Sequence, residues 1–305
     1  MAGSASALVG QPEGRNIFYY WDDPSQVPPR FMANIRIARA MNYDWDVHLL
    51  GDDVVETEIA AFDPELLAQY RRIRIPACRS DIARLVLLYR HGGWYLDADI
   101  EPRKALDIFG VGKPVLFWRD DADADGFGRV TNMAMYLPKG HSLALDALKV
   151  LRGYIREEVN LHSVFRLSGP GLITAVAERN GVAEDDLHSF LKHFRGGFAT
   201  FRPTSHETSS SWILLQAFGI FDGTKPSYPA FPKKIDADKA EVLIDFAKRW
   251  KLEGACRELF RRRPAYLEIS ELRQFSETLG PGVKGVLKGM KNRGLKTGSG
   301  GQNAR

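Results

Sequence analysis

The chain has 305 residues, of which 44% are hydrophobic and 26% are charged, an ordinary composition for a globular protein. This composition excludes a collagen-like chain, a wholly disordered chain and a minimal disulfide scaffold. The net charge of +4 is small for this length, so charge alone is no argument for a nucleic-acid partner. Two cysteines, Cys78 and Cys256, are far apart in the sequence, and we predict that both are reduced, structural thiols.

The sequence also predicts where the chain resides and how it divides. It has no apolar run of about 18 residues, the length that predicts a membrane-spanning helix, and its start lacks the basic and apolar regions of a secretory signal. We expect a cytoplasmic protein that is either soluble or peripheral at the inner membrane face. The predicted parts are a disordered N-terminus (1–14), one folded domain (15–270) and a basic, partly disordered C-terminal tail (271–305).

Strand and helix patterns alternate along the first half of the chain. In chain order they predict a strand at 16–21, a helix at 29–41, a strand at 45–50, helices at 64–72 and 80–90, and strands at 94–100, 114–118 and 130–137. Helices predominate from residue 142 onward. Alternation of this kind indicates an α/β fold.

The segment from Ser80 to Asp99 carries the clearest chemical signal. Ser80 is the type of residue that caps a helix, and Gly92-Gly93 is typical of a helix end. Asp81 and Arg84 lie one turn apart, so they share one flank of the predicted helix. On its own, this spacing is also that of an ordinary surface ion pair, which contributes little to stability.

After the two glycines, strand alternation places Tyr95, Asp97 and Asp99 on one face of the predicted strand. Two carboxylates so close together repel each other and need compensation when they are buried. Hard oxygen ligands suit Mg²⁺ or Mn²⁺, which commonly keep positions open for a substrate phosphate. Asp-x-Asp occurs elsewhere in the chain, but only this copy follows a helix and a double glycine; the others are interpreted as solvated acidic turns.

The pattern Ser80-Asp81-x-x-Arg84, followed by Gly92-Gly93-x-Tyr95-Leu96-Asp97-x-Asp99, resembles the DXD core of glycosyltransferase family 32. That family includes bacterial polysaccharide and fungal mannosyltransferases and the catalytic domain of large clostridial glucosylating toxins. The resemblance implies a GT-A fold, which is a Rossmann-like nucleotide-sugar-binding single domain, here with helical additions. It also implies a nucleoside diphosphate sugar donor, a Mn²⁺ or Mg²⁺ ion and retention of the anomeric configuration.

The resemblance assigns expected roles to the residues of the motif. Asp99 is expected to bind the metal directly, and Asp97 to contact the ribose or to reach the ion through water. Asp81 and Arg84 are expected to hold hydroxyl groups of the donor sugar, and Tyr95 to lie in the donor site.

Further residues match the family in chain order. Tyr20 and Trp21 correspond to the place where a tryptophan stacks on the nucleotide base, and Asn42 to a nucleotide contact. Asn132 resembles the asparagine that meets the donor sugar, and we include it with Asp97 and Asp99 among the expected catalytic residues. Ser168-Gly169-Pro170-Gly171 resembles an element that opens a helix near the acceptor cleft.

The segment His206 to Trp212 resembles the last motif of the family. Glu207 and Ser210 are expected to complete the metal site, and Trp212 to donate its indole N–H to a phosphate oxygen. Many members of the family carry paired histidines at this place. They suggest an alternative ligand set for the metal, in which His206 or Glu207 acts together with Ser211.

The leading hypothesis is therefore a metal-dependent, retaining transfer of a hexose to a surface polysaccharide or glycolipid. The alternatives are a toxin-like transfer to a protein side chain and a non-catalytic, membrane-associated protein that binds sugar nucleotides. Seven basic residues between Lys248 and Arg263 are interpreted either as the face of an ordinary solvated helix or as a surface that docks on an anionic membrane, which would then be a further partner. No nucleic-acid partner is expected. Retention implies either a carboxylate nucleophile or attack on the face of the leaving diphosphate, and we adopt the latter.

Overall fold

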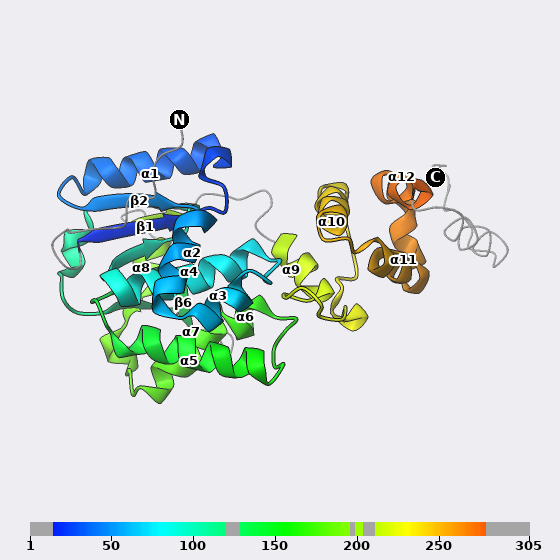
Figure 1. Cartoon of the computed structure of the whole chain (residues 1–305). Helices are drawn as coiled ribbons and strands as arrows, with labels where there is room; N and C mark the ends of the chain where they lie inside the picture. Colours follow the sequence, from blue (N-terminus) through cyan, green and yellow to red (C-terminus); the bar gives the residue numbers. More distant parts are fainter. Residues whose placement is uncertain (1–14, 120–128, 196–198, 204–210, 279–305) are drawn as a thin grey trace, which may run out of the picture. The chain divides into compact units, whose positions relative to one another are not determined.

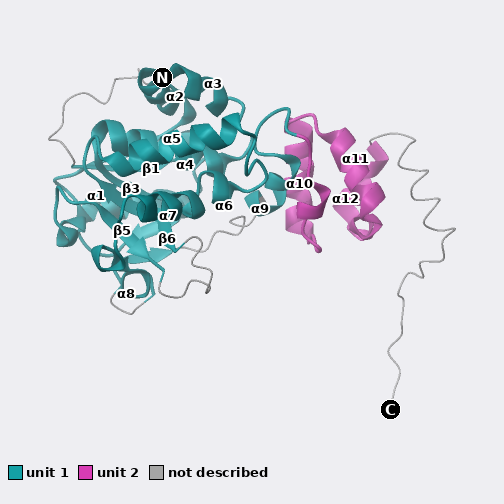
Figure 2. Cartoon of the chain, turned by 90° about the horizontal axis from the view of Figure 1, so that it is seen from below, with its two compact units in different colours: residues 1–224 teal, residues 225–305 magenta. Residues whose placement is uncertain are grey.

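The computed structural model describes residues 15–119, 129–195, 199–203 and 211–278. The chain divides into two compact units, residues 1–224 and residues 225–305, which Figure 2 shows in teal and magenta. The predicted folded domain, 15–270, thus extends across unit 1 and into unit 2. The predicted N-terminus, 1–14, lies outside the described residues.

Unit 1 is built on a six-stranded sheet with the order β2-β1-β3-β6-β5-β7. Its strands are β1 (Asn16–Tyr20), β2 (Asp46–Leu50), β3 (Gly93–Leu96), β5 (Val115–Trp118), β6 (Val130–Leu137) and β7 (His188–Ser189). β1 runs parallel to both β2 and β3, whereas β6 is antiparallel to β3 and β5. A smaller antiparallel sheet pairs β4 (Ile100–Pro102) with β8 (Phe201–Pro203). Figure 1 shows the strands among the surrounding helices, and the predicted α/β class is confirmed.

The helices of unit 1 connect and cover these strands. They are α1 (Pro29–Met41), α2 (Asp52–Phe62), α3 (Pro64–Tyr70), α4 (Pro76–His91), α5 (Ser142–Arg156), α6 (Val164–Leu167), α7 (Pro170–Arg179), α8 (Phe190–Phe194) and α9 (Ser211–Leu215). The sequence patterns did not predict α2. Its first turn carries Asp52 and Asp53, residues of modest helix propensity, and the helix is held by packing on α3 and α4.

Alternating residues of the strands face different layers. Ile17 and Tyr19 of β1 lie in a buried apolar cluster with Ile35 and Ala38 of α1. The intervening side chains face α4, because the ring of Phe18 lies 6.1 Å from that of His91. The carboxyl end of α4 therefore lies at the amino edge of the parallel strands, and its first turns lie at their carboxyl edge.

Two glycines make the tight connection from α4 into β3. Gly92 and Gly93 have φ angles of 68° and 119°, in the range where a side chain is strained. A Cβ atom on Gly93 would lie 2.3 Å from the carbonyl oxygen of Asn16. The close approach of β1 and β3 thus requires glycine at this position.

Gly93→Ala is expected to destabilise the protein by about 2 kcal/mol or more, because it combines an unfavourable φ with a backbone collision. Gly153→Ala is the matched control. Gly153 lies within α5, a Cβ atom there would meet nothing within 4 Å, and alanine in a helix interior is about 0.5–1 kcal/mol better than glycine. Urea unfolding of both variants measures the difference, and equal stability of the two would contradict this explanation of Gly93.

Unit 2 is helical. It contains α10 (Ala237–Arg249), α11 (Glu253–Arg262) and α12 (Ser270–Thr278). Each helix buries an apolar face, formed by Leu243 and Phe246, Leu259 and Phe260, and Leu272 and Phe275. α12 falls within the predicted tail, 271–305, of which residues 279–305 lie outside the described part. Every helix that the structure describes is too short or too polar to cross a bilayer.

Candidate functional site

The Asp-x-Asp motif follows β3 at the carboxyl edge of the parallel strands. The prediction that both carboxylates lie on a strand face was wrong in detail: β3 ends at Leu96, and Asp97 to Asp99 form a turn. The turn is closed by the amide N–H of Ile100, which donates to the carbonyl oxygen of Asp97 at 2.9 Å. The side-chain amide of Asn34 on α1 holds the carbonyl oxygen of Ala98 at 2.9 Å. Backbone contacts thus fix the turn and leave both carboxylates half-buried.

Arg84 lies at the centre of the charged group. Its side chain is only 2% exposed, and its guanidinium pairs with Asp97 at 2.6 Å and with Asp81 at 3.0 Å. The guanidinium also lies over the ring of Tyr95, 4.4 Å from its centroid. Burial disfavours the charge of Arg84, but Asp97 and Asp81 raise its pKa, so it remains a cation. The pair of Asp81 with Arg84 is therefore buried, and not the surface pair that the spacing alone allows.

Asp81 is held by two further elements. One carboxylate oxygen accepts from the side-chain amide of Asn132 on β6 at 2.8 Å, and the other accepts from the hydroxyl of Ser168 at 2.8 Å. Burial raises the pKa of Asp81 to about 6, against the opposing effects of Arg84, Ser168 and Asn132. The structure thus brings Asn132 to the motif by way of Asp81, and its contact with the donor sugar stays a prediction.

The two carboxylates of the motif disfavour each other's charge. Burial raises the pKa of Asp97 despite its contact with Arg84. Burial and the charge of Asp97 together raise the pKa of Asp99 to about 7. The single positive charge of Arg84 therefore does not offset the negative charges of the carboxylates around it. A bound cation would favour the ionised form of both Asp97 and Asp99. Their hard oxygen atoms are the ligands that Mg²⁺ and Mn²⁺ prefer, so the described donor set fits such an ion.

The motif alone does not complete a metal centre. Within the described ranges, no three His, Cys, Asp or Glu side chains gather closely enough to hold an ion. Glu207 and Ser210, the other predicted ligands, and His206 lie outside the described residues, as does the side chain of Ser211. Their assignment to the metal stays a prediction.

Ser80 does not cap the helix, because α4 begins four residues earlier with Pro76 in its first turn. Its hydroxyl instead lies 2.8 Å from the phenol oxygen of Tyr95. Burial raises the pKa of Tyr95, so the phenol stays neutral. Tyr95 thus forms one wall around Arg84, and a role in donor binding stays a prediction.

Tyr20 and Trp21 lie at the end of β1. This strand runs parallel to β3, with Phe18 paired with Tyr95, so the end of β1 lies beside the motif that follows β3. Tyr20 is buried, and its hydroxyl donates to Asp52 at 2.6 Å. Trp21 is partly exposed, with its ring 5.5 Å from that of Phe31. Of the two aromatic residues, Trp21 is therefore the one that a nucleotide base can reach.

Asn42 is not brought to this group. It follows α1 and precedes β2, at the amino edge of the parallel strands, and it is 1% exposed. Its side-chain amide donates to the carbonyl oxygen of Ala38, and its oxygen accepts from the amide of Leu106 at 2.7 Å. Asn42 thus bonds to backbone in this structure. Trp212 lies in the first turn of α9 and is partly exposed.

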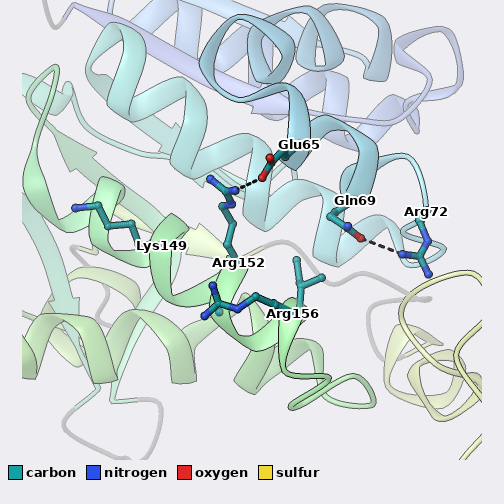
Figure 3. Close-up of a pocket in the computed structure, with 8 residues that line it drawn as sticks. Glu65, Gln69, Arg72, Lys149, Arg152 and Arg156 are labelled. Atoms are coloured by element: carbon teal, nitrogen blue, oxygen red, sulfur yellow. Dashed lines mark hydrogen bonds and ion pairs between the residues drawn. The ribbon is translucent and has the colours of Figure 1, made fainter.

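A separate pocket of about 530 Å³ lies between α3 and α5, as Figure 3 shows. Half of its eight lining residues are basic, and Arg152 among them pairs with Glu65 of the same lining. None of the predicted site residues lines it. This pocket therefore does not contain the motif.

Sequence reasoning missed two parts of this edge. It assigned no contact between Ser168 and Asp81, which are 87 residues apart. It also missed Asp52, whose carboxylate accepts from Tyr20, from Tyr70 at 2.7 Å and from Arg79. The double aspartate after β2 was the available signal.

The residues at the carboxyl edge of the parallel strands lie in a region that is similar to a known protein family. Residues 28–116 match the family described as "Glycosyltransferase sugar-binding region containing DXD motif". This part of the chain is thus similar to the sugar-binding region of DXD glycosyltransferases. The matched range includes Asp81, Arg84, Tyr95, Asp97 and Asp99, and the predicted resemblance to DXD glycosyltransferases is confirmed.

Two curated glycosyltransferases are similar to parts of this chain. Inositol phosphoceramide mannosyltransferase 3 of Schizosaccharomyces pombe is 25% identical over 156 residues, which are 50% of this chain and 41% of that protein. The uncharacterized glycosyltransferase L373 of Acanthamoeba polyphaga mimivirus is 46% identical over 52 residues, 17% of this chain and 21% of that protein. The chain thus spans less than half the length of either relative.

Among solved structures, two glycosyltransferases are similar to this chain. The PaToxG glycosyltransferase is 16% identical, with a TM-score of 0.42 over 56% of this chain and 70% of that chain. The ligand-free glycosyltransferase domain from the YGT toxin is 9% identical, with a TM-score of 0.45 over 88% of this chain and 94% of that chain.

Proposed function

We propose that the protein is a metal-dependent, retaining glycosyltransferase that transfers a hexose from a nucleoside diphosphate sugar. The observation that carries this proposal is the turn at Asp97 to Asp99, which presents two half-buried carboxylates beside buried Arg84 within the matched sugar-binding region. Both carboxylates have a raised pKa. A site of this kind is suited to a divalent cation that binds a diphosphate.

In this proposal Asp99 binds Mn²⁺ or Mg²⁺ directly, and Asp97, which is held by Arg84, orients water or the ribose. The bound ion would supply Lewis-acid stabilisation of the leaving diphosphate. Glu207 and Ser210 complete the ligand set. The topology supports this, because Pro203 at the end of β8 pairs with Ile100, the residue after Asp99. The chain therefore leaves β8 at a position beside the motif, four residues before Glu207.

The chain's other residues bind and orient the donor. Trp21 stacks on the base, since it is partly exposed at the end of the strand next to β3. Asp81 and Arg84 hold the sugar hydroxyls, because a carboxylate and a guanidinium fork fix orientation. Trp212 donates its indole N–H to the diphosphate. The acceptor attacks on the face from which the diphosphate leaves, which gives retention.

We further propose a glycolipid or surface polysaccharide as the acceptor, reached from the cytoplasm at the inner membrane face. The name of the S. pombe relative, an inositol phosphoceramide mannosyltransferase, supports a lipid-linked acceptor. Unit 2 supports contact with an anionic membrane, because Lys248, Arg249, Lys251 and Arg257 are exposed. Arg261 and Arg262 contribute less, because both pair with Glu258.

Nucleotide release from UDP-glucose, UDP-galactose, UDP-GlcNAc and GDP-mannose tests the reaction. We expect one of these donors to be hydrolysed or transferred with Mn²⁺ or Mg²⁺ and not after chelation. With a radiolabelled form of that donor and a cell lysate, the label is expected in the lipid or polysaccharide fraction. Label in protein would favour a protein acceptor, and no release by folded protein with either metal would contradict the proposed reaction.

A further inference from the structure

Ser168 lies at the junction between α6 and α7 and is 1% exposed. The backbone fixes its position, because the amides of Ser168 and Gly169 both donate to the carbonyl oxygen of Val164, at 3.0 and 2.9 Å. Its hydroxyl lies 2.8 Å from a carboxylate oxygen of Asp81 and 3.3 Å from the carbonyl oxygen of Val164. One hydroxyl has one hydrogen, and the shorter, charged acceptor is the stronger partner.

The hydrogen bonds of Asp81 leave little freedom in its carboxylate. An ionised carboxylate has about four acceptor positions, two on each oxygen. The amide of Asn132 donates to Oδ1, the Arg84 guanidinium lies 3.0 Å from the same oxygen as an ion-pair partner, and the Ser168 hydroxyl donates to Oδ2. On Oδ2, one acceptor position is left for a ligand. The hydroxyl of Ser168 therefore determines the direction from which Oδ2 can accept.

We propose that Ser168 is a positioning residue for the donor sugar. It fixes the Asp81 carboxylate so that its remaining acceptor position is directed at a sugar hydroxyl. This inference rests on the proposed function, in which Asp81 contacts the sugar. Without the Ser168 hydroxyl, Oδ2 has two open positions, and the sugar loses a preorganised partner. The base and the diphosphate contact other residues, so their binding does not depend on Ser168.

Thr174 provides a matched control in α7, the helix that begins two residues after Ser168. It is 3% exposed, its hydroxyl oxygen accepts from the amide of Val130 at 3.0 Å, and the hydroxyl donates to the carbonyl oxygen of Pro170 at 2.8 Å. Like Ser168, it links α7 to the elements around the site, through the start of β6. Its bonds do not involve Asp81. Thr174→Val therefore removes a buried hydroxyl without changing the acceptor positions of Asp81.

The test compares nucleotide sugars with their sugar-free nucleotides. Calorimetry with Mn²⁺ gives the Kd of UDP-glucose, UDP-galactose, UDP-GlcNAc, GDP-mannose, UDP and GDP for wild type, Ser168→Ala and Thr174→Val, with urea unfolding of each. We expect Ser168→Ala to raise the Kd of the bound nucleotide sugar about tenfold, the effect of losing one hydrogen bond to a charged group. The Kd of UDP or GDP should stay unchanged, and Thr174→Val should change neither.

The outcomes separate this inference from the proposed function. An equal rise for the nucleotide sugar and the free nucleotide in Ser168→Ala, or an equal rise in both variants, would show a merely structural role and overturn the inference. An unchanged Kd for the nucleotide sugar in Ser168→Ala would also overturn it. If the folded wild type binds UDP or GDP but none of the four nucleotide sugars, the proposed function itself fails, and this inference fails with it.

Discussion

Asp99→Asn is expected to lower metal-dependent sugar transfer at least about a hundredfold while leaving the fold intact. Asp99 is half-buried, and burial and the Asp97 charge raise its pKa to about 7. An asparagine keeps the size of the side chain but removes the charge that a divalent cation would bind. Because the same change removes repulsion with Asp97, the variant should be no less stable than wild type.

Nucleotide release at saturating Mn²⁺ measures this loss, with thermal unfolding as the test of folding. Asp46→Asn is the matched control, since Asp46 also belongs to an Asp-x-Asp sequence and is half-buried. It lies in the first position of β2, at the opposite edge of the parallel strands. Wild-type activity in Asp99→Asn, or an equal loss in Asp46→Asn, would contradict the assignment of Asp99.

Arg84→Met is expected to lower the free energy of unfolding by about 3–5 kcal/mol, the usual effect of removing one partner from a buried ion pair. Arg84 is 2% exposed and pairs with both Asp81 and Asp97. Methionine fills similar space but leaves the buried Asp81 carboxylate without a cation. The variant should also lose donor binding, because the guanidinium fork is absent.

Urea unfolding provides the measurement, and Arg71→Met is the control. Arg71 pairs with Glu56 at 2.7 Å, but its side chain is 60% exposed, and exposed pairs contribute about 0–1 kcal/mol. A loss in Arg84→Met no larger than that in Arg71→Met would mean that Arg84 is not the compensating charge of the site.

Local patterns predicted the parts of the site that lie within one or two turns of chain. The spacing of Asp81 and Arg84 placed them on one flank of the helix, and the alternation after Gly93 placed Tyr95 and Asp97 on the side that faces Arg84. The end of β3 at Leu96 was not predicted. It depends on the hydrogen bond from Ile100 to Asp97, which an alternating pattern does not reveal.

The remaining features depend on contacts between distant residues. Ser168 meets Asp81 only because α6 and α7 return to α4. Asn42 was predicted to contact the nucleotide, but the length of α1 carries it to the other edge of the sheet. The prediction of one domain through residue 270 lacked any signal at Thr224, where the two compact units divide. An amphipathic pattern shows that one face of a helix is buried, but it does not reveal to which compact unit the helix belongs.

Metal-dependent binding of a nucleotide sugar is the most direct test of the central claim, that the carboxylates of Asp97 and Asp99 form a donor site. Wild-type protein would be titrated by calorimetry with UDP-glucose, UDP-galactose, UDP-GlcNAc and GDP-mannose, first with Mn²⁺ and then after chelation. The account predicts that one donor binds with Mn²⁺ and that its binding is lost or greatly weakened by the chelator. Binding of that donor with the same Kd in both conditions, or no binding of any donor by folded protein, would contradict it.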